Sequence, residues 1–113
     1  MNPGTIVLAR IPQGSIVDTK PRPALVVAKL PGTVESVLLC GISSRLLISI
    51  EGWDVLVDHQ HPDFVGSGLH VPSMIRPSWL AAFPTAGLMA IGSVSRATVN
   101  EVRLRLASVL EPV

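Results

Sequence analysis

The chain has 113 residues, of which 48% are apolar and 15% are charged, and its formal net charge is +1. This length predicts a single domain over residues 1–113, and the apolar content can form a packed core without a metal or disulfide framework. A pI near 8.0 gives no indication of nucleic-acid binding, because dedicated binders usually have a pI above about 9. Any such contact needs a local cluster of cations.

The mean hydropathy of +0.51 is high for a small soluble monomer, so either a membrane segment or a partner would cover apolar surface. The longest uncharged stretch, residues 77–95, contains Pro84, two glycines and several hydroxyl side chains, whereas a spanning helix needs about 20 mostly apolar residues. The first four residues lack the basic segment of a signal peptide, and Arg10 interrupts the first apolar run. We therefore expect a cytoplasmic protein, not bound to a membrane, that forms a homodimer.

The single cysteine, Cys40, lies in the apolar run of residues 37–40. One cysteine excludes an internal disulfide and a cysteine-rich zinc site. Because no neighbouring residue would lower its pKa, we predict a buried core thiol rather than a nucleophile.

Short apolar runs separated by proline and glycine predict strands and turns. The expected strands cover residues 5–11, 24–28, 36–42, 54–58, 73–76 and 88–91, with an extended continuation over 46–50 and polar loops over 12–21 and 59–68. The run over 24–28 is continuously apolar and is expected to be buried on both faces, whereas the run over 54–58 alternates and is expected to be half-exposed.

One helix is predicted at the C-terminal end. Ser95 is a good N-cap, and an apolar stripe follows at steps of three and four residues, formed by Val99, Val102, Leu106 and Val109 and widened by Leu110. Pro112 is expected to end the helix. The fold class is therefore mainly β with a C-terminal α-helix, in the form of a small SH3-like barrel.

Five segments occur in the order and spacing typical of the MazF/PemK/Kid toxins. They are GTIVL at 4–8, KPRPALVV at 20–27, ISS at 42–44, GLHVPSMIR at 68–76 and IGSVS at 91–95. The chain thus resembles this family over nearly its whole length. The resemblance implies a metal-independent, sequence-selective endoribonuclease that needs no cofactor and cuts single-stranded RNA, usually mRNA. It also implies a homodimer that is held in check by a cognate antitoxin.

Three residues are expected to carry catalysis. Arg22 lies between two prolines in the KPRP motif, and its planar guanidinium suits phosphate oxygens. Ser43 takes the place of the family's threonine at the end of the third strand, where its hydroxyl could bond a phosphate. Arg76 fits a general-acid or phosphate role. The alternatives without a catalytic role are that Arg22 is an ordinary surface arginine and that Ser43 is a serine that closes a turn.

Further residues are expected to contact RNA, namely Asp18, Lys20, Ser44, Arg45, His70 and Ser78. Lys20, Ser44 and Arg45 lie close in sequence to Arg22 or Ser43, the residues expected to bind the phosphate, and Asp18 precedes Arg22 in the loop. Many family members carry Arg-x-Asp where this chain has Arg76-Pro77-Ser78, and Ser78 cannot act as a carboxylate base. Asp18 or a histidine is then the alternative base, unless the enzyme is weakened.

The histidines and aromatic rings leave alternatives open. His59 and His61 are spaced like metal ligands, but without a third His or Cys nearby we expect a solvated loop and no metal. His70 is the histidine nearest the motif and is a minor acid–base candidate. Among the rings, Trp53 or Phe64 could stack bases, whereas Trp79 is interpreted as a core or dimer-interface anchor.

Two other functions are alternatives to an active ribonuclease. A binding module of the same fold could bind RNA or the antitoxin without cutting; Ser78 favours it and the intact KPRP motif argues against it. An SH3-like adaptor for proline-rich peptides is poorly supported, because such grooves need several exposed aromatics and the chain has no tyrosine.

Overall fold

A computed structural model describes residues 1–10 and 20–113. Within them the strands are β1 (Thr5–Ala9), β2 (Arg22–Leu30), β3 (Ser36–Ser43), β4 (Val55–Val57), β5 (Ser73–Pro84) and β6 (Met89–Ser93), and the helix is α1 (Arg96–Leu110). Two 3₁₀ turns, η1 (Leu46–Ile48) and η2 (Thr85–Gly87), lie between strands. The predicted fold class, mainly β with a C-terminal helix, is confirmed.

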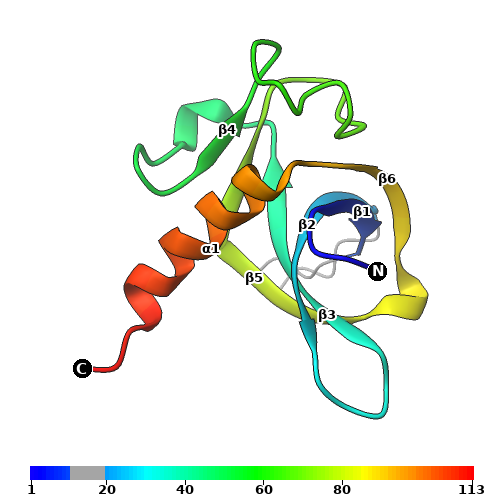
Figure 1. Cartoon of the computed structure of the whole chain (residues 1–113). Coiled ribbons are helices and arrows are strands. Elements are labelled where there is room, and N and C mark those ends of the chain that lie inside the picture. The colour runs from blue at the N-terminus through cyan, green and yellow to red at the C-terminus, as the bar shows by residue number, and fades with distance from the viewer. Residues whose placement is uncertain (11–19) are drawn as a thin grey trace.

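The six strands form one antiparallel sheet in the order β4-β5-β3-β2-β1-β6. The sheet curls into a half-barrel, and α1 runs diagonally past β4 and β5 with the C-terminus projecting away from the strands (Figure 1). Because β2 and β3 are adjacent and antiparallel at the centre of this order, the start of β2 lies beside the end of β3. This arrangement brings the KPRP and ISS motifs to one edge.

The core has two clusters, one on each face of the curled sheet, because successive side chains of a strand point to opposite faces. The cluster under α1 contains Leu25, Val27 and Cys40 from the strands and Val99 and Val102 from the helix. The cluster on the other face contains Val7, Ala9, Ala24, Val26, Val37 and Leu39. The prediction that residues 24–28 are buried on both faces is confirmed for all but Ala28, which is partly exposed.

Cys40 is fully buried, as predicted. Burial penalises the thiolate and raises the pKa of Cys40 to about 12. The thiol is therefore a packing residue and not a nucleophile.

Three sequence expectations were wrong in their bounds or type. The first strand was expected over residues 5–11, but β1 ends at Ala9. Residues 46–50 do not continue as an extended strand. Leu46–Ile48 instead form a 3₁₀ turn that pairs with no strand of the sheet and has no buried residue. The strand expected over 73–76 continues to Pro84 as β5. Its second half alternates between exposed and partly buried side chains, in the pattern of a sheet surface, and pairs with β3.

Helix α1 begins as expected, with the Ser95 side chain accepting a hydrogen bond from the Thr98 amide. The carboxylate of Asp63 accepts further bonds from the hydroxyls of Ser95 (2.9 Å) and Thr98 (2.5 Å) and so ties the 59–68 loop to the helix start. The apolar stripe is buried only at Val99, Val102 and Leu106. No helix in the described ranges is long and apolar enough to cross a membrane.

Candidate functional site

One open pocket of about 850 Å³ lies where the start of β2 meets the end of β3. Its described lining is Leu8, Arg22, Pro23, Ile42, Ser43, Ser44, Arg45, Ile48, Gly68, Leu69, His70, Val71, Ser73, Trp79 and Ile91. The volume is in the range of small-ligand sites. The lining combines two arginines and three serines with apolar side chains, and it contains no Asp or Glu among the described residues.

Arg22 and Ser43 lie in this pocket because of the register between β2 and β3. The pairs Leu25↔Cys40 and Ala24↔Gly41 are antiparallel, so two further steps along each strand put Arg22 opposite Ser43. The prolines on either side of Arg22 favour an extended backbone there, and the residue is exposed at the strand start. A permanent cation and a hydroxyl therefore line the same concave surface.

Ser43 lines the pocket and is largely buried, with the residue 9% exposed. Its hydroxyl oxygen accepts a hydrogen bond from the Arg45 amide at 3.1 Å, so the hydroxyl keeps its own hydrogen to donate to a ligand. The same bond shapes the turn that presents Ser44 and Arg45, both exposed, at the pocket wall.

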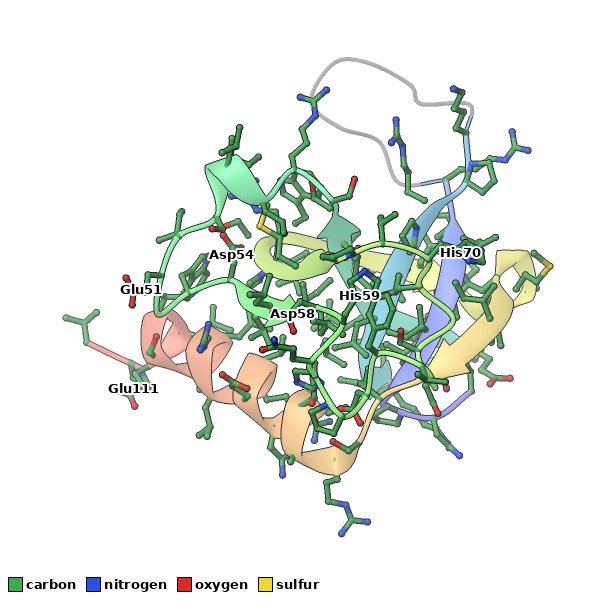
Figure 2. The ribbon with its side chains drawn as sticks, turned by 90° about the horizontal axis from the view of Figure 1, so that it is seen from above. Glu51, Asp54, Asp58, His59, His70 and Glu111 are labelled. Atoms are coloured by element: carbon green, nitrogen blue, oxygen red, sulfur yellow. The ribbon has the colours of Figure 1, made fainter. Side chains whose placement is uncertain are left out.

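The 68–73 segment also lines the pocket, with His70 exposed and Ser73 buried. Figure 2 shows His70 on the side of the molecule where β1 and β2 lie, away from the labelled acids Glu51 and Glu111. The pocket is thus bordered by cations and hydroxyls, an environment that favours an anionic ligand.

Four of the residues predicted from the sequence are not part of the described lining. Asp18 lies outside the described residues. Lys20 is exposed just before β2. Ser78 accepts a hydrogen bond from the Trp53 ring nitrogen at 2.8 Å. Arg76 is the fourth, and its surroundings are the least like those of a solvent-facing phosphate ligand.

Arg76 is 9% exposed, and its Nε lies 3.2 Å from Oδ1 of Asp54, whose side chain is 1% exposed. The other carboxylate oxygen of Asp54 accepts a bond from the Ile50 amide at 2.7 Å. The Arg76 guanidinium carbon also lies 4.9 Å from the centroid of the Trp79 ring, a cation–π contact. Arg76 is therefore engaged on both sides, by a carboxylate and by an indole.

Among the lining residues that sequence reasoning did not assign to the site, one is aromatic and one is polar. Trp79 was interpreted as a core or dimer anchor, but it lines the pocket. Ser73, within the GLHVPSMIR motif, lines it as well and donates a hydrogen bond to the Val71 carbonyl at 2.8 Å. The rings expected to stack bases are engaged elsewhere: Trp53 bonds Ser78, and Phe64 packs edge-on against His59 with centroids 4.6 Å apart.

The histidine pair has a local structural role in the 59–68 loop. His61 accepts a hydrogen bond from the Asp63 amide at 3.0 Å through Nδ1, while His59 packs on Phe64. Within the described ranges no group of three or more His, Cys, Asp or Glu side chains could hold a metal ion.

The sequence and fold were compared with known proteins. The family model described as "PemK-like, MazF-like toxin of type II toxin-antitoxin system" matches residues 2–110. A solved structure of the Mycobacterium tuberculosis toxin MazF-mt6 is similar with a TM-score of 0.61 and covers 96% of each chain at 16% identity, which shows a shared fold. No curated protein matches the chain. Because the family model spans nearly every residue, the chain belongs to the PemK-like, MazF-like toxins of type II toxin–antitoxin systems.

Proposed function

We propose that this toxin is a metal-independent endoribonuclease that cuts single-stranded RNA, with mRNA as its cellular substrate. One observation carries the proposal: Arg22 and Ser43 line a single concave pocket together with Arg45, and no acid is found among the described lining residues. A phosphodiester is an anion with oxygens at the spacing of a guanidinium fork. The pocket is therefore suited to hold one phosphate of a flexible strand.

In the proposed reaction the RNA supplies its own nucleophile. The 2′-oxygen forms a bond to the adjacent phosphorus as the bond from phosphorus to the 5′-oxygen breaks, which yields a cyclic phosphate and a 5′-hydroxyl end. A base takes the 2′ proton and an acid returns a proton to the leaving oxygen. Arg22 and the Ser43 hydroxyl neutralise the charge that builds on the phosphate oxygens.

We assign the supporting roles by position. Ser44 and Arg45 contact the strand on one side of the phosphate, since they line the pocket next to Ser43. His70 also lines the pocket and is an acid–base candidate. Asp18 remains a candidate base from the sequence, and Lys20 a candidate for an outer phosphate contact.

In this proposal Arg76 and Ser78 do not contact the scissile phosphate directly. The Arg76 guanidinium is bound to Asp54 and the Ser78 hydroxyl to Trp53, so neither is aimed at the phosphate. A serine at position 78 then removes no carboxylate from the pocket. This weakens the alternative of a catalytically inactive binding module, which was favoured by that serine alone.

Partners follow from the family and from exposed apolar side chains. A toxin of this family has an antitoxin partner. We propose that the chain acts in the cytoplasm as a homodimer, because large apolar side chains are exposed on several elements, among them Leu47, Val65 and Leu104. Light scattering at micromolar protein should give the mass of a dimer, and a monomer mass would contradict the proposal.

The decisive experiment is cleavage of a long single-stranded RNA by the purified toxin in EDTA. We expect discrete fragments ending in cyclic phosphate, at least 100-fold slower formation with Arg22→Ala, and an intermediate loss with Ser43→Ala. The matched control is Arg96→Ala, since Arg96 is exposed on α1, outside the described pocket lining. Intact RNA with a measurable binding shift would support the binding module instead.

A further inference from the structure

The pairing of β3 with β5 contains a large bulge beside the pocket. Cys40 pairs with Leu80, whereas Ile42 pairs with Ile75. Gly41 on β3 therefore faces the whole segment 76–79 of β5. Pro77 lies in this segment and has no amide hydrogen for the ladder, and bulges commonly re-aim a side chain next to a functional site.

The bulge directs Trp79 into the pocket, and Gly41 makes the necessary room. A Cβ added at Gly41 would lie 2.9 Å from Cε3 and 3.0 Å from Cβ of Trp79, closer than real Cβ atoms tolerate. The indole thus packs directly on the backbone of β3 while its remaining surface lines the pocket. Trp53 braces the same bulge by donating its ring N–H to Ser78.

The indole is also fixed before any ligand arrives. The guanidinium of Arg76 lies 4.9 Å from the ring centroid, and that guanidinium is held in turn by Asp54 at 3.2 Å. Asp54 is buried and anchored by the Ile50 amide. Arg76, Asp54 and Gly41 therefore define one orientation for Trp79, so little side-chain entropy is lost when a ligand packs on it.

The surroundings of Trp79 in the pocket indicate what packs there. Arg22 and Arg45 line the same pocket and provide cations, while Leu8, Ile42 and Ile91 add apolar surface. A cationic groove with an aromatic wall is how proteins hold single-stranded nucleic acid, with phosphates on the cations and bases on the rings.

We propose that Trp79 contacts the nucleobase adjoining the phosphate that Arg22 grips, and that Arg76 is the residue that positions Trp79. This inference rests on the proposed ribonuclease function for its choice of ligand. It assigns base contact to the one tryptophan in the pocket and not to Trp53 or Phe64. It also gives Arg76 a role through the indole and not through the scissile phosphate.

Intrinsic fluorescence tests the base contact, because the chain has two tryptophans. A Trp53→Phe variant leaves Trp79 as the sole emitter, and a Trp79→Phe variant leaves Trp53. We expect an uncleavable 2′-O-methyl oligonucleotide to quench the first variant strongly and the second little. Polyphosphate, which has charge but no bases, should quench neither. Equal quenching of both variants, or none of the first, would overturn the proposal.

Cleavage kinetics test the same contact independently. Trp79→Leu should raise KM about 10-fold or more with a smaller change in kcat, and Trp79→Phe should restore most of the loss. Gly41→Ala should reproduce the KM effect, since the added methyl displaces the ring. Circular dichroism and thermal melting exclude misfolded variants. Unchanged KM in folded Trp79→Leu would refute a base contact.

The positioning role of Arg76 has its own readout. Arg76→Lys keeps a positive charge for Asp54 but removes the planar group over the indole. In the Trp53→Phe background it should lower the fluorescence anisotropy of Trp79 and raise KM, with kcat changed less. An unchanged anisotropy would reject the positioning role.

The two proposals fail separately. If the wild-type toxin leaves RNA intact but the Trp79 emission of the Trp53→Phe variant is quenched by the oligonucleotide, the ribonuclease proposal fails and the base contact stands. If Arg22→Ala abolishes cleavage while Trp79→Leu cuts normally, the ribonuclease proposal stands and the base contact fails.

Discussion

Replacing Asp54 by alanine tests whether the Asp54–Arg76 pair stabilises this fold. The Asp54 side chain is 1% exposed and that of Arg76 11%, so the substitution leaves a nearly buried guanidinium without its counter-charge. Breaking a buried ion pair in this way costs about 3–5 kcal/mol. The Ile50 amide also loses its acceptor, but Ile50 is 52% exposed and water can replace that bond. We therefore expect a loss of about 4 kcal/mol in the free energy of unfolding.

This loss is large against the total. A chain of 113 residues has an unfolding free energy of roughly 6–17 kcal/mol. Urea unfolding followed by circular dichroism should therefore show a clear fall in the midpoint, at an unchanged slope. The double variant Asp54→Ala, Arg76→Met should regain about 2 kcal/mol or more, because the uncompensated charge is then removed too. A single-variant loss under about 1 kcal/mol, or strictly additive losses, would refute this account of the pair.

The same double variant separates two roles for Arg76. If Arg76 is a general acid, restoring stability leaves cleavage about 10²–10⁴-fold slower in kcat. If Arg76 positions Trp79, the stabilised double variant mainly loses affinity, and KM rises while kcat changes less. Comparing kcat with KM in one folded protein therefore decides between the sequence prediction and the role inferred from the structure.

Three further outcomes are expected. Burial raises the pKa of Cys40 to about 12, so an aromatic disulfide reagent at pH 8 should react slowly until urea unfolds the chain, and equal rates would mean an open core. For Asp63, partial burial raises the pKa, but the hydrogen bond from Thr98 and its other polar partners lower it by more, so the pKa lies below its ordinary value. A lowered pKa means that the ionised carboxylate stabilises the fold; this stabilisation is present above the unfolded pKa and is lost as pH falls through the folded pKa. The difference in melting temperature between wild type and Thr98→Val should therefore shrink below about pH 4. A difference that does not depend on pH would contradict this account. Gly68 has a φ of +76°, and an added Cβ would lie 2.3 Å from a carbonyl oxygen, so Gly68→Ala should cost more than about 2 kcal/mol in urea unfolding; Gly52→Ala, with a φ of +77° but open space, should cost about 1 kcal/mol.

The parts of the site that could be predicted are those encoded by short, local signals. The prolines around Arg22 mark the start of a strand, and the serine pair at 43–44 marks the end of another. Adjacent antiparallel strands bring a start and an end to the same edge of a sheet, so a shared site for Arg22 and Ser43 could be expected before any coordinates. The helix start at Ser95 was predictable for the same reason, since its cap is a local hydrogen bond.

The parts that could not be predicted depend on pairs that are distant in sequence. Asp54 and Arg76 are 22 residues apart, and no local pattern marks a lone aspartate as the partner of a particular arginine. The segment 46–50 has the apolar composition of a strand, yet it has no neighbouring strand to pair with and closes into a 3₁₀ turn. Tertiary pairing, and not propensity, decided both cases.

The position of Trp79 depends on a single irregularity of the sheet, the bulge between β3 and β5. In a regular ladder an apolar ring after Arg-Pro-Ser is expected to pack in the core or at an interface. Here Gly41 faces four residues of β5, and this mismatch turns the indole to the pocket wall. The same bulge carries Arg76, whose bond to buried Asp54 we expect to stabilise the fold. Stability and nucleobase contact would then depend on one segment, so substitutions at position 54 should change both the unfolding midpoint and KM, although Asp54 is not among the described residues that line the pocket.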